Sequence, residues 1–115
     1  MRRLMVSRRW FGQGLGASLT LPLAGKARAN GQVRQIAVSD FAFAPDKLQI
    51  TVGDTVVWIN EDLAPHTATS DDGDWDTGQI EKGQTARQVF EKPGTFSYFC
   101  AFHPHMTGRI VVLPR

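Results

Sequence analysis

The amino-acid sequence predicts an all-β protein, a Greek-key β-sandwich of seven or eight strands, from three observations. Short runs rich in valine, isoleucine and aromatic residues recur after residue 32. Turn signals such as Gly53-Asp54 and Pro93-Gly94 separate these runs at short intervals. No segment after Gln32 sustains the apolar stripe of an amphipathic helix. Together these features are typical of an antiparallel sandwich or barrel.

The expected strands follow one another with short connections. The runs that stand out are residues 33–38, 48–52, 55–59, 85–90, 95–100 and 109–113. Apolar and polar residues alternate in 48–52, which predicts a strand with one buried face. Residues 55–59 form a nearly continuous β-branched and aromatic run, which is typical of a core strand, and Trp58 is expected in the core.

Residues 1–29 are expected to be an export signal peptide and residues 30–115 a single domain. The first segment has a basic start and no acidic residue, an apolar stretch of roughly ten residues where a spanning helix needs ~20, and Ala27-Arg28-Ala29 as a cleavage site. Ser7-Arg8-Arg9-Trp10-Phe11 resembles the twin-arginine signal. We therefore expect a periplasmic protein without stable membrane insertion. The alternative is an amphipathic N-terminal helix that stays attached.

The charge of the chain is divided between its two parts. The whole chain carries +2, but all 11 acidic residues follow residue 29 together with only seven of the 13 basic ones, so the expected domain carries −4. The high isoelectric point belongs to the leader and is no argument for binding nucleic acid. We expect a monomer.

Four candidate metal ligands lie in two short segments. Cys100, His103 and Met106 are spaced by threes after a predicted strand, and His66 follows the Trp58 strand. Two imidazoles, one thiolate and a weak axial thioether are the ligand set of a type 1, or blue, copper site. Cys100 is the single cysteine of a chain that is expected to be exported, and a role as metal ligand would protect its thiol from oxidation.

Two other interpretations of these residues stay open. Zinc could bind to Cys100, His66 and His103 if Met106 only filled the core, although methionine is a poor zinc ligand. Alternatively, the cysteine and methionine are ordinary buried residues and the histidines lie on the surface. The position of Met106 favours copper.

The segment from about Val33 to Leu113 resembles a cupredoxin, most closely the amicyanin and plastocyanin group. Cys100-x-x-His103-x-x-Met106 is similar to the short ligand loop of amicyanins, and Pro65-His66 matches the first ligand of the family. Trp75-Asp76-Thr77-Gly78 resembles a turn of the same family. Thr67 departs from the family, which often has asparagine there to bond across to the cysteine loop.

The resemblance implies one type 1 copper and a one-electron carrier between redox proteins. The donor would be a dehydrogenase or another redox protein, and the acceptor a c-type cytochrome or an oxidase. An apolar face for electron transfer is implied at four residues next to the histidine ligands, Ala64, Pro65, Phe102 and Pro104. Thr67 and Asn60 would support the ligands from outside the metal's contact sphere. His105 is interpreted as a surface histidine.

Three other functions are weighed against the electron carrier. A copper-binding protein for periplasmic delivery or storage would use the same ligands but release copper readily. A multicopper oxidase or nitrite reductase needs more histidines than the three present, so the chain is not expected to be an enzyme. A module that has lost its metal would not keep a full ligand set.

Overall fold

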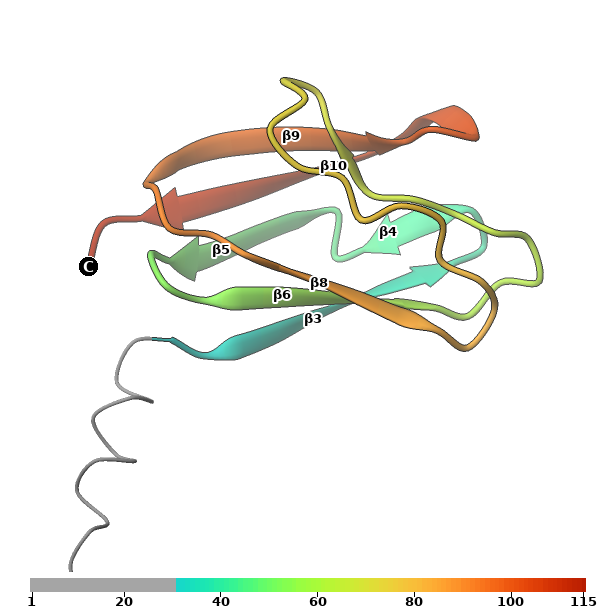
Figure 1. The fold of residues 1–115 in the computed structure, drawn as a ribbon, viewed down its shortest axis with the longest axis horizontal. Helices are drawn as coiled ribbons and strands as arrows, with labels where there is room; N and C mark the ends of the chain where they lie inside the picture. Colours follow the sequence, from blue (N-terminus) through green and yellow to red (C-terminus); the bar gives the residue numbers. More distant parts are fainter. Residues whose placement is uncertain (1–30) are drawn as a thin grey trace, which may run out of the picture. The chain divides into compact units, whose positions relative to one another are not determined.

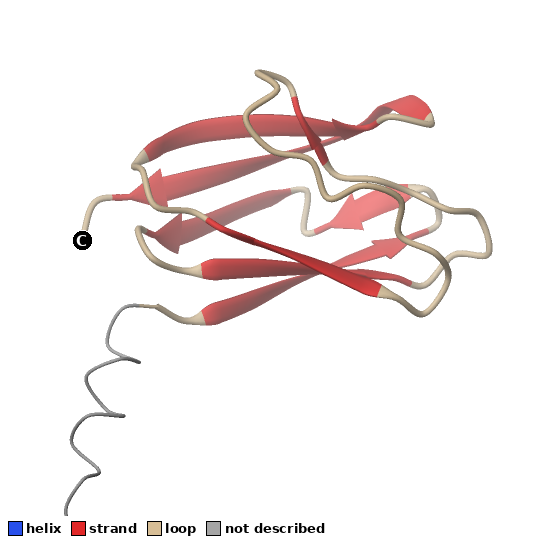
Figure 2. Cartoon of the chain, in the orientation of Figure 1, coloured by secondary structure: helices blue, strands red, loops and turns tan. Residues whose placement is uncertain are grey.

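A computed structural model of the chain describes residues 31–115, and these residues form eight strands joined by loops and turns. The strands are β3 (Val33–Ser39), β4 (Ala42–Ala44), β5 (Lys47–Thr51), β6 (Thr55–Asn60), β7 (Thr69–Ser70), β8 (Thr85–Val89), β9 (Gly94–Cys100) and β10 (His103–Leu113). Figure 2 shows no helix in this part of the chain. No helix within residues 31–115 has the length and apolarity needed to cross a membrane. The expected signal peptide at residues 1–29 lies outside the described residues.

The strands form two four-stranded sheets that pack as the layers of a sandwich (Figure 1). One sheet has the order β5-β10-β9-β7 and the other β4-β3-β6-β8. The all-β sandwich of seven or eight strands is confirmed. The sequence patterns suggested an antiparallel sandwich, and two of the strand pairs are parallel instead. β10 pairs with β5 in parallel, and β3 pairs with β6 in parallel. Parallel partners need a crossover connection, and here the chain crosses between the sheets before it returns.

Two strands and one strand boundary differ from the sequence-based expectation. β4 and β7 have only three and two residues, too short to show any periodicity. β10 begins at His103 rather than at Arg109, because the residues after the cysteine turn straight back along β9. Pairing with a distant neighbour, rather than local preference, therefore makes these segments into strands.

The core lies between the two sheets and is rich in aromatic residues. The inward positions of β6, Val56 and Trp58, are fully buried, as the alternation of that strand requires. Trp58 Nε1 donates a hydrogen bond to the hydroxyl of Tyr98 over 3.3 Å, and burial raises the pKa of Tyr98 above its ordinary value despite this bond. A Cβ atom on Gly108 would lie 2.3 Å from Tyr98 Cζ, so only glycine lets the ring pack there.

Two strand ends place the candidate ligands at one end of the sandwich. β6 ends at Asn60 in one sheet, and β9 ends at Cys100 in the other. The loop that follows β6 reaches across to the other sheet, where the Thr67 N–H donates a hydrogen bond to Cys100 Sγ. The turn between β9 and β10 and the loop after β6 therefore meet.

Candidate metal centre

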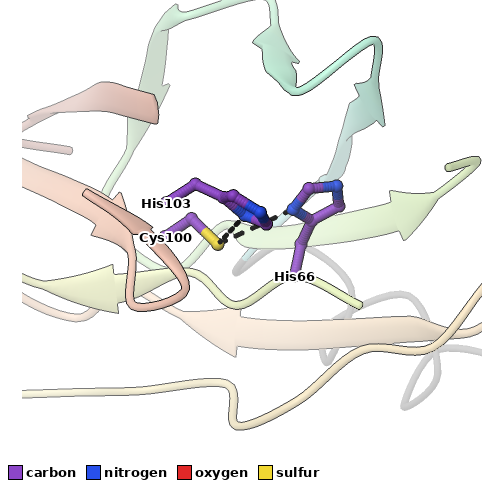
Figure 3. Close-up of side chains that lie close together, drawn as sticks. All are labelled: His66, Cys100 and His103. Carbon is purple, nitrogen blue, oxygen red and sulfur yellow. Dashed lines mark hydrogen bonds between the residues drawn. The ribbon is translucent and has the colours of Figure 1, made fainter. Parts of the chain in front are cut away.

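Three of the four candidate ligands converge on one point. The ligand atoms of His66, Cys100 and His103 all lie within 4.8 Å of one another. Cys100 Sγ is 3.6 Å from His66 Nδ1 and 3.6 Å from His103 Nδ1. Figure 3 shows both rings turned toward the sulfur atom. His66 and Cys100 are completely buried, whereas His103 is partly exposed, so the site has one side open to solvent.

The turn between β9 and β10 explains how Cys100 and His103 come together. Cys100 is the last residue of β9 and pairs directly with His103, the first residue of β10. Opposite residues of an antiparallel pair have neighbouring side chains, so both point to the same side. The ladder is interrupted between His103 and Thr107, which leaves Pro104, His105 and Met106 outside the regular pairing.

A backbone bridge holds His66 in the loop after β6. The His66 N–H donates to the carbonyl oxygen of Ile80 over 3.1 Å, and the Ile80 N–H donates to the carbonyl oxygen of His66 over 2.7 Å. Asn60 supports the same loop from the end of β6. Its amide donates to the carbonyl oxygens of Ala64 and Ile80, and its Oδ1 accepts from the N–H of Asp62. Asn60, which was predicted to support the ligands, thus shapes the loop that carries His66.

Asp62 determines which nitrogen of His66 can bind a metal. His66 Nε2 lies 2.9 Å from Asp62 Oδ2, close enough to donate its proton to that oxygen. Nδ1 is then left with a free lone pair that faces Cys100. Burial alone would raise the pKa of Asp62, but hydrogen bonds from the backbone of Phe41 and Asp40, with that from His66, hold it below its ordinary value. The carboxylate is therefore charged at neutral pH.

Thr67 joins the two loops that carry the ligands. Its N–H donates to Cys100 Sγ over 3.4 Å, and its Oγ1 accepts from the N–H of Ala101 over 2.8 Å. The hydroxyl lies 2.9 Å from Thr69 Oγ1, which in turn donates to Asp76 Oδ1 over 3.2 Å. Threonine therefore makes the bond to the cysteine loop that the cupredoxin resemblance implies for asparagine at this position.

The other residues singled out in the sequence lie around this centre. Met106 is buried in the core three residues after His103. Phe102 is 49% exposed and Pro104 is exposed, whereas Ala64 and Pro65 are partly buried. His105 is exposed, as a surface histidine would be. Leu63, which was not expected in the apolar face, is 84% exposed beside Ala64.

Sequence reasoning missed two residues of the centre, Asp62 and Phe41. The spacing of four residues between Asp62 and His66 was a signal that could have been used. The ring of Phe41 stands edge-on to both imidazoles, with centroids 5.1 Å from His66 and 4.8 Å from His103. No local pattern marks Phe41, because it lies 25 residues before His66 in the chain.

The arrangement fits a metal ion bound to the three side chains. A sulfur atom ~2.3 Å and a nitrogen atom ~2.0 Å from one ion, at the angles of a trigonal or tetrahedral site, are roughly 3.5–3.7 Å apart. The two sulfur–nitrogen distances of 3.6 Å agree with this spacing. One thiolate and two imidazoles with a buried thioether nearby suit copper better than zinc.

Comparisons with known proteins show what this chain is similar to. Residues 15–112 match the model of the family described as "Cupredoxin-like domain". Amicyanin of Paracoccus denitrificans is 30% identical over 96 residues, which cover 79% of this chain and 72% of the relative.

Solved structures agree with the sequence matches. A purple cupredoxin from Nitrosopumilus maritimus superposes with a TM-score of 0.64 at 30% identity, covering 69% of this chain and 98% of the other. A copper-containing nitrite reductase from Thermus scotoductus has a TM-score of 0.66 at 31% identity. The match covers 70% of this chain but only 22% of the reductase, so the shared part is a minor portion of that enzyme.

Proposed function

Because the chain belongs to the cupredoxin family and copper is its cofactor, we propose that it is a type 1 copper protein that carries single electrons between redox proteins in the periplasm. His66 and His103 would provide the imidazole ligands, Cys100 the thiolate and Met106 a weak thioether contact. When bound, the copper takes up and releases one electron at a time. The observation that carries the proposal is the convergence of one buried thiolate and two imidazoles, each 3.6 Å from the sulfur.

The protein supports electron transfer by keeping its ligands still. Asp62 and the bridge to Ile80 hold His66, while the hydroxyl of Thr67 ties its loop to Ala101. Ligands that are fixed before the metal arrives move little when its charge changes, and the N–H bond to the sulfur also tunes the potential. The partly exposed edge of His103, with Phe102 and Pro104 beside it in the chain, is the proposed contact for partners.

The proposed donor is a dehydrogenase or another redox protein, and the proposed acceptor is a c-type cytochrome or an oxidase. An enzyme of the nitrite reductase type is not proposed. The chain of the similar reductase is several times longer than the part it shares with this protein. A second copper site would need more histidines than the three in this sequence. A copper-storage role is less well supported, since complete burial of His66 and Cys100 opposes rapid release of copper.

The spectrum of the protein loaded with copper(II) tests the metal centre. We expect an intense visible band from thiolate-to-copper charge transfer, which disappears on reduction. Cys100→Ser should remove the band, whereas His105→Gln, a change at the exposed histidine, should preserve it. A colourless protein that still binds copper would contradict the carrier function and favour copper storage, or zinc as the resident metal.

Export is proposed from residues 1–29 and has a separate test. The protein isolated from the periplasm of a twin-arginine-competent host should have a mass that corresponds to a chain beginning at Asn30. Replacing both Arg8 and Arg9 with lysine should leave the uncleaved chain in the cytoplasm. A mass that corresponds to the complete chain in the periplasm would show that the segment is not a cleaved signal.

A further inference from the structure

Asp40 and Phe41, in the turn between β3 and β4, have an unusual backbone conformation. Both have φ of 55°, in the left-handed region that side chains other than glycine seldom adopt. For a bulky residue such as phenylalanine this conformation costs energy, and such strain persists only where the surroundings hold it. The Asp62 carboxylate does so here. It accepts the N–H of Asp40 over 2.8 Å and the N–H of Phe41 over 2.9 Å.

The strained turn places an aromatic ring between the ligands and solvent. Phe41 contacts both His66 and His103 edge-on, yet 47% of the residue is exposed. A protein that docks on this ring would touch a group already in contact with both candidate ligands. Exposed aromatic side chains are the residues that most often dominate contact energies in protein interfaces.

The flank of Phe41 is acidic. Asp40 precedes it in the turn, and the Glu61 N–H donates to the carbonyl oxygen of Val38, which brings Glu61 beside the same end of β3. Both residues are exposed, and neither carboxylate forms an ion pair with any residue in 31–115. The loop before β8, which bonds to Asn60 through Gly83 and Gln84, contributes Glu81 and Lys82, whose charges cancel. The charge beside Phe41 is thus negative and available to a partner.

We propose that this surface, Phe41 flanked by Asp40 and Glu61, docks a redox protein whose own contact surface is positively charged. The inference deepens the proposed electron-carrier function and rests on it. One electron passes between the copper and the partner's redox centre near the edge of Phe41. As copper(I) becomes copper(II), the oxidised centre of the partner is reduced by one electron. Opposite charges increase the rate of such encounters, and the small apolar contact allows rapid release.

Mapping with a cation tests where positive charge binds. The probe is hexaamminechromium(III), a paramagnetic and redox-inert cation, added to the reduced, copper-loaded protein. We expect the amide signals of Asp40, Phe41 and Glu61 to broaden first in the NMR spectrum. The rival location is the acidic turn at residues 71–76. Broadening that begins at this turn would overturn the proposal.

Kinetics with two small oxidants test whether the acidic flank acts on electron transfer. Tris(phenanthroline)cobalt(III) is a cation and hexacyanoferrate(III) an anion, and each takes one electron from the reduced protein. In Asp40→Asn/Glu61→Gln, we expect oxidation by the cobalt complex to slow about 3- to 10-fold at low ionic strength and oxidation by hexacyanoferrate to accelerate. At ~1 M salt, where the screening length is ~3 Å, both differences should vanish.

The control double variant, Asp74→Asn/Glu91→Gln, removes the same charge from exposed residues. Both residues lie at the other end of the sandwich from the ligands. They line a cavity with Val89, which pairs with Thr55 at the start of β6, whereas the ligand loop follows Asn60 at the end of β6. Equal rate changes in both double variants would overturn the proposal, because net charge alone would then explain them. The absorption spectrum separates the two hypotheses. Loss of the charge-transfer band in the unmodified protein would contradict the carrier function itself, whereas an intact band with unchanged rates would contradict only the docking surface.

Discussion

Replacing Thr67 with valine tests how the two ligand loops are held together. Valine keeps the shape of threonine but removes its hydroxyl. Thr67 is a buried residue, only 5% exposed. That hydroxyl accepts from the N–H of Ala101 over 2.8 Å and bonds to Thr69 over 2.9 Å. A net intramolecular hydrogen bond contributes about 1 kcal/mol, and a buried donor left without a partner costs about 1–3 kcal/mol. The expected loss is therefore about 2–3 kcal/mol of unfolding free energy.

The assay is guanidinium unfolding of the metal-free protein, followed by tryptophan fluorescence, to which the buried Trp58 and its neighbour Trp75 both contribute. Metal-free protein is used because a bound ion adds its own binding free energy to the apparent stability. In thermal unfolding, a loss of this size should lower the melting temperature of such a domain by roughly 10–20 °C. Thr67→Ser, which retains the hydroxyl, should recover most of the loss.

Thr69→Val serves as the matched control, because its hydroxyl is the outer member of the same chain of bonds. Thr69 is partly exposed and its bond to Asp76 lies in solvent, so the expected loss is below about 1 kcal/mol. If Thr67→Val unfolds within about 0.5 kcal/mol of the unmodified protein, the hydroxyl does not join the loops as described.

Three further perturbations probe the core and the ligand support. Gly108→Ala should destabilise the protein by about 1–3 kcal/mol in the same unfolding assay, because its Cβ would overlap the ring of Tyr98; no loss would show that the strands can move apart. Tyr98 is the only tyrosine, so phenolate absorbance reports it alone. Because burial raises the pKa of Tyr98, its phenol in the folded protein should stay protonated near pH ~10, where the unfolded chain ionises. The free energy of unfolding should therefore fall as the pH rises above ~10. Ionisation of the folded protein near pH ~10 would refute the burial argument. Asp62→Asn leaves one oxygen to serve three donors, so amide exchange at Asp40 and Phe41 should accelerate about 10- to 100-fold by NMR, and unchanged exchange would mean that another group holds the turn.

Local sequence patterns were sufficient to predict much of the fold. The alternation in β5 and the β-branched run in β6 each extend over several consecutive residues, so one short window contains the signal. β4 and β7 had no such signal, since their two or three residues are strands only by virtue of distant partners. The early start of β10 was also missed, because proline and histidine at its beginning do not resemble a strand.

The candidate ligands were predictable because their chemistry is unusual in combination. Cys100, His103 and Met106 lie within seven residues, and a tight turn after a strand can bring such near neighbours together without help from the rest of the fold. The addition of His66 needed only the assumption that two strands end at the same edge.

By itself, the sequence determined the all-β class and the set of donor atoms, because both depend on the types and spacing of residues close together in the chain. Only the tertiary structure decided how the donors are held and covered. The Asp62 carboxylate accepts from backbone groups 21 and 22 residues away, and Phe41 reaches the ligands from the turn after β3, the strand that pairs with β6. These contacts follow from the parallel pairing of β3 with β6. The two strands are far apart in the sequence, and no local pattern indicates that they pair. Their strength depends on burial and on exact placement, which exist only once the sandwich has formed.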